Sequence, residues 1–326
     1  MTNKRKKRIV CIGGGTGPST LLEGLRAMSE MFDITAIVGM ADRGGSSEIL
    51  RDERGALPPG DVLKALLALS PKPYARELLQ FRWDGKMPAK MRGHTAGNLL
   101  LTFCSEMIGD FSEAVRAFSE LLDCRGQVLP ASLDHVDLVA KLCSGEEIIG
   151  EGRIEEWIYG FLNGNHSTDR ILSVHLQPQP VLAKAARLAI LHADIVVIGP
   201  GSFYTSLVAG LLVSGMREAL AKARIAYVVN LTNNPHETPD WTGSHYVTKL
   251  EEVIDRKVNF VICNSSLPRR VQRNYLRQGY SPVKDGLAHN PGDRQVISAN
   301  LVASDSALSR HDPTRIAGLI ATIANG

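Results

Sequence analysis

The stretch CIGGGTGPST, at Cys11–Thr20, places four glycines directly after a short apolar run. That run, Arg8–Ile12, has the continuous apolar character of a strand buried on both faces of a parallel sheet. Helical spacing follows over Thr20–Glu30, where Leu21 and Leu25 fall on one face. Because glycine loses more conformational entropy on folding than any other residue, such a loop indicates that a ligand approaches the backbone closely.

The order strand, glycine loop, helix is typical of an anion site. The first N–H groups of a helix have no partner within the helix and, together with its dipole, attract phosphate. The loop lacks the third glycine of a dinucleotide fingerprint and the ending of a Walker loop, so neither motif is predicted. A tight turn without a ligand is the alternative. The nucleotide-binding residues expected in this loop are Gly13, Gly14, Gly15, Thr16 and Gly17.

Strands and helices alternate along most of the chain. Further strands are predicted at residues 33–42, 193–199, 225–232 and 259–264. Helices are predicted at residues 60–69, 94–108, 112–123, 206–215, 244–254 and 312–324, whereas residues 71–93 look irregular. The fold class we expect is α/β, with a doubly wound, mostly parallel, Rossmann-like sheet whose ligands lie beyond the carboxyl ends of its strands.

The expected domain organisation is a basic tail at residues 1–7 and a single α/β domain over residues 8–326. The run KRKKR at the start predicts a solvated tail. Several short β-like pieces with turn signals lie between residues 126 and 171. They predict a small β-rich excursion from the main sheet.

The composition of the 326 residues, 44% hydrophobic and 22% charged, is that of a globular protein. A formal charge of +3 is too small to indicate a nucleic-acid partner. No apolar stretch reaches the roughly 18 residues of a membrane-spanning helix. The five cysteines are scattered and form no CxxC pair, which favours a reducing cytoplasm and argues against a zinc site.

Two further strand ends carry polar loops. The strand at 33–42 ends in ADRGGSS, where Asp42 stands near the position of a ribose-binding acid, a helix cap or turn being the alternative. The motif IGPGSFYTS at 198–206 repeats the order apolar strand, glycines, helix. Two such loops on parallel strands indicate a ligand with more than one anionic group, such as a diphosphate. The candidates in the second loop are Gly199, Gly201, Ser202 and Tyr204.

Other polar residues follow predicted helix starts and strand ends. His94 and Asn98 are four residues apart, which would place them on one helical face. Asn98 is a binding candidate, whereas His94 is equally a cap or a core histidine. The long polar loop at 230–245 adds Asn230 and Thr232 as candidates. Its histidines lack the short spacing of zinc ligands, so no metal site is predicted.

Seven motifs together resemble the YvcK branch of the CofD-like superfamily, in the order in which that branch has them. The likeness runs from about Arg8 to Ile323, and its motifs are IGGGTG, ADRGGSS, LPPGD, GHTAGN, IGPGSFYTS, NLTNNPHET and RHDP. The resemblance implies a CofD-like fold. The superfamily's enzyme, 2-phospho-L-lactate transferase, moves a phospholactyl group from a nucleotide diphosphate donor to a deazaflavin. The YvcK branch is described as a gluconeogenesis factor that binds UDP-sugars, such as UDP-N-acetylglucosamine, and affects cell shape and carbon-source use.

One residue departs from the family pattern. Arg43 stands where the family commonly has a second aspartate beside Asp42. Paired carboxylates there would suit a divalent metal that bridges phosphates, whereas a guanidinium can pair with phosphate oxygens without metal. We therefore favour a nucleotide-sugar-binding regulatory protein that requires no cofactor. The alternative is a phospholactyl-type transferase, and magnesium is expected only in that case.

The C-terminal motif SRHDPTRIAGLI contributes the last candidate. Asp312 and Pro313 have a sufficient role as the cap and first-turn residue of a helix. Arg310 is not needed for capping, and the resemblance implies that it folds over the crevice toward the diphosphate or the base. The alternative is a solvated surface arginine. The expected partner is thus a nucleotide-sugar, and the sequence leaves open both turnover and the formation of a homodimer.

Overall fold

The computed structural model describes residues 5–82, 93–160, 168–284, 286–287, 294–303 and 310–326. These residues form a central sheet of seven strands, all of whose pairings are parallel, so the predicted α/β doubly wound sheet is confirmed. Its strands are β1 (Lys7–Ile12), β2 (Phe32–Val38), β3 (Gln127–Pro130), β7 (Ile195–Ile198), β8 (Ile225–Val228), β10 (Phe260–Asn264) and β12 (Gln295–Ala299).

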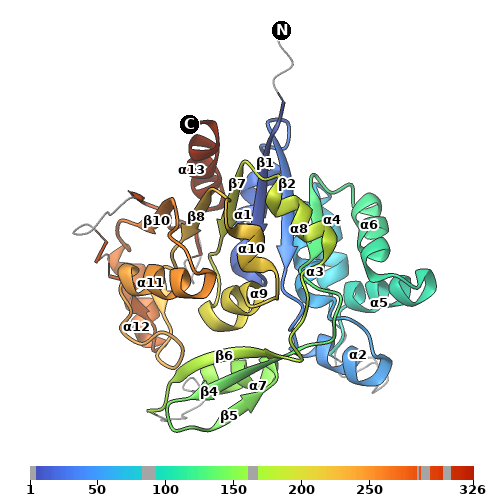
Figure 1. Cartoon of the computed structure of the whole chain (residues 1–326), viewed down its shortest axis with the longest axis horizontal. Coiled ribbons are helices and arrows are strands. Elements are labelled where there is room, and N and C mark those ends of the chain that lie inside the picture. Colours follow the sequence, from blue (N-terminus) through green and yellow to red (C-terminus); the bar gives the residue numbers. More distant parts are fainter. Residues whose placement is uncertain (1–4, 83–92, 161–167, 285, 288–293, 304–309) are drawn as a thin grey trace.

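The strand order is β12-β10-β8-β7-β1-β2-β3. The chain moves outward from β1 through β2 to β3, returns to β7 on the other side of β1, and then moves outward in the opposite direction (Figure 1). The order therefore reverses between β1 and β7. In open α/β sheets this reversal opens a crevice beyond the carboxyl ends of the strands, where ligands bind.

Helices cover both faces of the sheet because its strands are apolar on both sides. Ile9 and Cys11 of β1 pack into one core and the alternate residues Val10 and Ile12 into the other. The first core is completed by α1 (Thr16–Arg26), α3 (Gly60–Leu69), α5 (Ala96–Ile108), α6 (Phe111–Leu121) and α13 (Pro313–Asn325). The second is completed by α8 (Lys184–Leu191), α9 (Ala209–Leu211), α10 (Met216–Leu220) and α11 (Gly243–Ile254).

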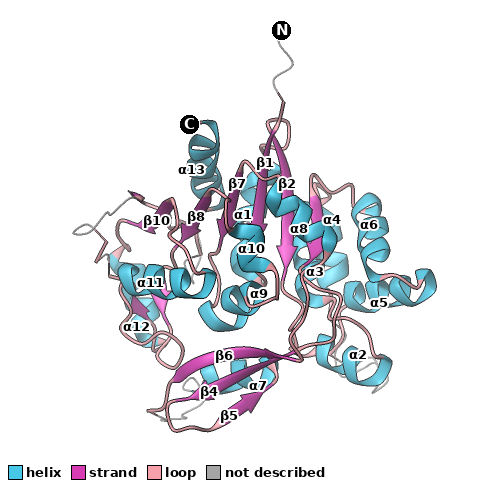
Figure 2. Cartoon of the chain, in the orientation of Figure 1, coloured by secondary structure: helices cyan, strands magenta, loops and turns pink. Residues whose placement is uncertain are grey.

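A second, antiparallel sheet lies beyond the carboxyl ends of the central strands, at the bottom of Figure 2. Its strands are β4 (Asp137–Leu142), β5 (Glu147–Ile149) and β6 (Ile171–Gln177), and α7 (Glu151–Ile158) follows β5. The segment expected as a β-rich excursion, 126–171, thus also contains the central strand β3 and a helix, and its residues 161–167 lie outside the described part. At the N-terminus, β1 already begins at Lys7, and Arg5 forms an ion pair with Asp194, so the expected tail is partly ordered.

Several predicted elements differ from the observed ones. The first helix begins at Thr16 rather than at residue 20, because Pro18 suits the first turn and the helix starts within the glycine loop. Within the segment expected to be irregular, α4 (Pro73–Gln80) is helical with proline at its start, and residues 83–92 lie outside the described part. A helix α2 (Ser46–Arg54) begins within the ADRGGSS motif, at its two serines. The predicted helix at 206–215 is a π-helical turn, Phe203–Val208, continued by α9.

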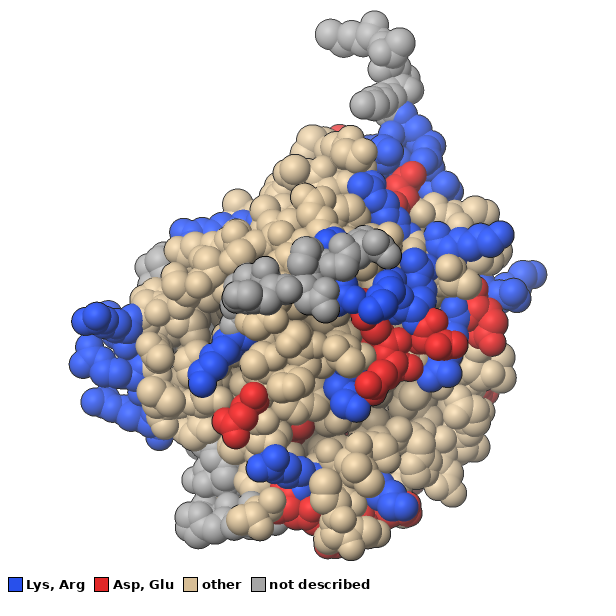
Figure 3. Space-filling view, turned by 60° about the vertical axis from the view of Figure 1, so that its left-hand side comes forward, with Lys and Arg blue, Asp and Glu red and all other residues tan. Residues whose placement is uncertain are grey.

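The remaining described elements follow strands β8 and β10 along the chain. They are β9 (Thr232–Asn233), β11 (Ser281–Pro282) and α12 (Arg269–Arg277). On the face drawn in Figure 3, basic side chains form separate groups with acidic side chains between several of them, so no continuous basic surface covers that face. Among the described helices, none is long and apolar enough to cross a membrane.

Candidate functional site

The loops after β1 and β7 lie side by side where the strand order reverses. The backbone N–H of Gly199 donates to the carbonyl oxygen of Ile12 at 3.4 Å. A Cβ atom at Gly17 would lie 2.2 Å from the carbonyl oxygen of Pro200, so only glycine allows this backbone contact. The structure thus brings together the two glycine loops that the sequence singles out. That they share one diphosphate stays a prediction.

The N-terminus of α1 is open toward this crevice. Its N-cap residue, Gly15, has a φ of 76°, a left-handed conformation that side chains disfavour. No side chain among the described residues caps the helix, and its first turn carries no acidic residue. The first N–H groups and the positive end of the helix dipole are therefore available to an anion, with the hydroxyl of Thr16 beside them.

A cavity of about 440 Å³ adjoins this loop on one side, and we call it the acidic compartment. Its carboxyl groups come from three elements: Asp42 follows β2, Asp61 lies in α3, and Glu151 and Glu155 lie in α7. Its other lining residues include Gly15, Ser46, Ser47, Lys64, Gln80, Arg82, Thr95, Asn98 and Ser206.

A second cavity of about 370 Å³ adjoins the other side of the α1 N-terminus, and we call it the arginine compartment. Arg76 and Arg310 line it, together with Thr16 and Ser19 of α1. Lys64 and Gln80 line both compartments. The two cavities are therefore neighbouring halves of one cleft, with the glycine loop between them.

Burial changes the protonation of the carboxyl groups in the acidic compartment. Burial, followed by the neighbouring Glu155, Asp42 and Asp61, raises the pKa of Glu151 to about 10. Burial also raises the pKa of Glu155, to which Glu151 is hydrogen-bonded. At neutral pH Glu151 therefore keeps its proton and can donate it to the neighbouring carboxylate.

The other acids of the compartment are tied to its walls. Asp42 accepts hydrogen bonds from Gly44 N at 2.8 Å and from Ser47 Oγ at 2.7 Å, while burial and Asp61 raise its pKa. Asp61 lies 2.8 Å from Lys64 Nζ and raises the pKa of that ammonium group. Among the described residues, no three acidic, histidine or cysteine side chains come close enough together to hold a metal ion.

Another cavity, of about 680 Å³, lies at the opposite end of the sheet, beside Arg8 of β1 and Asp33 of β2. That end carries the amino termini of the strands, where open α/β sheets do not hold their ligands. The cleft at the carboxyl edge is therefore the candidate functional site.

Comparison with known proteins matches residues 9–302 to the family model of 2-phospho-L-lactate transferase CofD. The chain belongs to the CofD family. A Thermotoga maritima protein is 36% identical over 327 residues, covering 97% of this chain and 99% of its own. A Bacillus subtilis protein described as gluconeogenesis factor is 35% identical over 323 residues, with 97% and 98% covered.

A solved structure extends this similarity to three dimensions. A Bacillus halodurans protein, 33% identical, superposes with a TM-score of 0.88, and the match covers 97% of this chain and 100% of that one. The predicted membership of the YvcK-like branch of the CofD family is confirmed by these matches.

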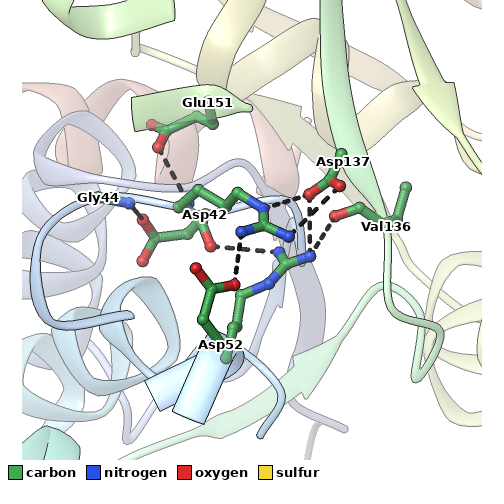
Figure 4. A network of polar contacts seen from close by, with 8 residues as sticks. Asp42, Gly44, Asp52, Val136, Asp137 and Glu151 are labelled. Carbon is green, nitrogen blue, oxygen red and sulfur yellow. Dashed lines mark hydrogen bonds and ion pairs between the residues drawn. The ribbon is translucent and has the colours of Figure 1, made fainter. Parts of the chain in front are cut away.

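In this CofD-family chain, the Arg43 guanidinium faces the second sheet rather than the cleft. It forms ion pairs with Asp137 of β4 and, at 2.8 Å, with Asp52 of α2 (Figure 4). Arg51 joins the same network through Val136 O at 2.9 Å and Asp137 at 3.1 Å. Arg43 lines neither compartment. The expectation that it pairs with a diphosphate is therefore not supported by its position.

The candidates after β7 and β8 mostly bind one another. Gly201 N donates to Asn230 Oδ1 at 3.2 Å, and Asn230 Nδ2 donates back to Gly201 O at 2.8 Å. Ser202 Oγ and Tyr204 N both donate to the buried carboxylate of Glu237, at 2.6 and 2.8 Å. Like Gly199 and Thr232, these residues line neither compartment. Their contacts hold the second glycine loop in shape.

The predicted pairing of His94 and Asn98 on one helical face is wrong. His94 precedes the helix, because Thr95 is the N-cap of α5 and accepts a hydrogen bond from Asn98 N. The imidazole of His94 instead contacts Ser46 Oγ at 2.9 Å, and burial lowers its pKa. Asn98 does line the acidic compartment, and Arg310 lines the arginine compartment, each as a wall residue of the cleft.

Several residues that line the cleft were not predicted as site residues, among them Asp61, Lys64, Glu151 and Glu155. Asp61 ends the motif LPPGD and lies at the start of the helix predicted at residues 60–69. The two glutamates are four residues apart, which would have placed both on one face of a helix if that segment had been predicted as helical.

Proposed function

We propose that this protein binds a UDP-linked sugar, UDP-N-acetylglucosamine in the first place, in the cleft at the carboxyl edge of the sheet. On this proposal it is a cytoplasmic regulatory protein of carbon metabolism and cell shape. The choice of nucleotide and the regulatory role come from the resemblance to the YvcK branch. The geometry of the cleft supports the placement that we propose for the ligand.

The observation that carries the proposal is the uncapped N-terminus of α1 between two adjoining cavities. A diphosphate placed at Gly15–Gly17 would meet backbone N–H groups and the helix dipole. A nucleoside diphosphate sugar has a different group at each end of its diphosphate. A cleft with one compartment on each side of the anion site suits a ligand of this shape.

A second candidate function is transfer of a phospholactyl group to a deazaflavin. It is favoured by the family model, which is described as a transferase, and by Asp42 and Asp61, which lie in the same compartment. A magnesium ion would then be needed to offset charge on the donor's phosphates. We favour binding without transfer because Arg43 replaces the second aspartate of the family pattern. Its guanidinium forms an ion pair with Asp137.

Calorimetric titration separates these functions. UDP-N-acetylglucosamine, GDP-linked and ADP-linked sugars are titrated with and without magnesium. We expect the UDP-sugar to bind most tightly and magnesium to change its affinity by less than about threefold. If none of the three compounds gives a binding heat, the proposal is overturned. Coupled product, detected by mass spectrometry after incubation with a phospholactyl nucleotide and a deazaflavin, would establish the transferase instead.

A further inference from the structure

The two halves of the cleft differ in charge. Arg76, Arg310 and Lys64 line the arginine compartment, where Glu23 is the acidic lining residue. In the acidic compartment, four carboxyl groups face the two cations Lys64 and Arg82. Because Glu151 keeps its proton, the acidic compartment holds at most three carboxylates against these two cations. The arginine compartment therefore attracts an anionic group more strongly than the acidic compartment does.

Asn98 provides an independent sign that the acidic compartment takes a ligand. The residue is 6% exposed and lines the cavity. Its backbone N–H is satisfied by Thr95 Oγ1, but its side-chain amide has no hydrogen-bond partner among the described residues. Because this amide lines the cavity, a ligand group that supplies both a donor and an acceptor would find a matching partner there.

We infer that the acidic compartment holds the sugar of the nucleotide-sugar and that the arginine compartment holds its nucleoside, an assignment that rests on the proposed function. A sugar is neutral and rich in hydroxyl groups, which donate hydrogen bonds to carboxylates. Asp61 and Glu155 provide such acceptors, and Asn98 can pair with a hydroxyl or an acetamido group. A cavity of about 440 Å³ lies within the usual size range of ligand pockets.

The test compares UDP with UDP-N-acetylglucosamine, because only the second carries the sugar. Both are titrated by calorimetry against the parent protein, Asn98→Ala and Glu155→Gln. Thr102→Val is the matched control, since Thr102 is one turn further along α5, buried, and outside the cavity. We expect each of the first two variants to lose about tenfold in affinity for the UDP-sugar and to bind UDP within twofold of the parent.

Four results would overturn the assignment, and each has a different meaning. If Asn98→Ala and Glu155→Gln lower the affinity for UDP as much as the affinity for UDP-N-acetylglucosamine, the acidic compartment holds the nucleotide instead. If the parent protein binds UDP as tightly as the UDP-sugar, the sugar has no subsite, although nucleotide binding stands. If the parent binds neither compound, the proposed function itself fails. If the affinity for UDP falls when magnesium is removed, the carboxylates hold a metal ion and the phosphates rather than the sugar.

Discussion

The carbonyl oxygen of Pro200 occupies the space that a side chain at Gly17 would need. A Cβ atom at position 17 would lie 2.2 Å from that oxygen. The start of α1 and the loop after β7 therefore meet backbone to backbone, at the point where the strand order reverses. The proposed anion site depends on this contact because the contact fixes one glycine loop against the other.

Substitution of Gly17 by alanine should destabilise the protein. The new methyl group would have to displace backbone atoms, and overpacking of this kind costs about 1–3 kcal/mol. Gly318→Ala is the matched control, since a Cβ there meets no atom within 4 Å and alanine is favoured within a helix. We expect a lower melting temperature for Gly17→Ala and an equal or higher one for Gly318→Ala. Equal stability of the two variants would show that the loops are not in contact.

Removal of the Arg310 side chain should weaken nucleotide-sugar binding. A charge-assisted hydrogen bond contributes about 1.5–3 kcal/mol, which corresponds to a loss of roughly 10- to 150-fold in affinity. Arg310→Ala is compared by calorimetry with Arg273→Ala, an exposed arginine on α12 that lines neither compartment. Binding of UDP-N-acetylglucosamine within twofold of the parent would remove Arg310 from the site.

Arg43→Ala should affect stability rather than binding, because the Arg43 guanidinium forms ion pairs with Asp137 and Asp52. In a double-mutant cycle with Asp137→Ala, urea unfolding should give a coupling energy of about 1 kcal/mol. The corresponding cycle for Arg54 and Glu106, an exposed pair, should give less, since exposed ion pairs contribute about 0–1 kcal/mol. A more than tenfold loss of UDP-sugar affinity in Arg43→Ala, at unchanged stability, would instead mean that Arg43 binds phosphate.

The Glu151 carboxyl group should make stability depend on pH. Its pKa rises from an ordinary value of 4.5 to about 10 in the folded protein, mainly through burial. Between these two values the folded state keeps a proton that the unfolded state releases, so stability falls as pH rises through that window. Glu151→Gln should flatten the fall in melting temperature between pH 6 and 9, measured without ligand.

The matched control for this prediction is Glu156→Gln, on the same helix but exposed. Its pH profile should follow that of the parent protein. Parallel profiles for Glu151→Gln and the parent would show that Glu151 is ionised at neutral pH.

Much of the central sheet could be predicted from sequence because its strands are apolar runs that end at polar or glycine residues. The strands ending at Ile12, Ile198 and Asn264 lie close to where they were predicted. The helix Glu151–Ile158 was missed because glycine and β-branched residues in EEIIGEGRI favour short strands. This segment is helical because of its packing, which intrinsic helix and strand propensities do not predict.

The candidate site could be predicted from sequence only where the backbone requires glycine. Gly15 and Gly17 stand out because their conformation and close contacts exclude side chains. The role of Asn230 could not be predicted, since only the structure shows that its amide is satisfied by Gly201. Nothing in the sequence around Glu155 marks it as a site residue, and it lines the cleft only because α7 lies against that cleft.

The most direct test of the proposed binding site is a crystal structure of the complex with UDP-N-acetylglucosamine. We expect the diphosphate within hydrogen-bond distance of the N–H groups at Thr16 and Gly17, with the sugar beside Asn98 and the nucleoside beside Arg310. The ligand bound instead in the cavity beside Arg8, at the opposite end of the sheet, would contradict the account. So would a diphosphate that lies away from the start of α1.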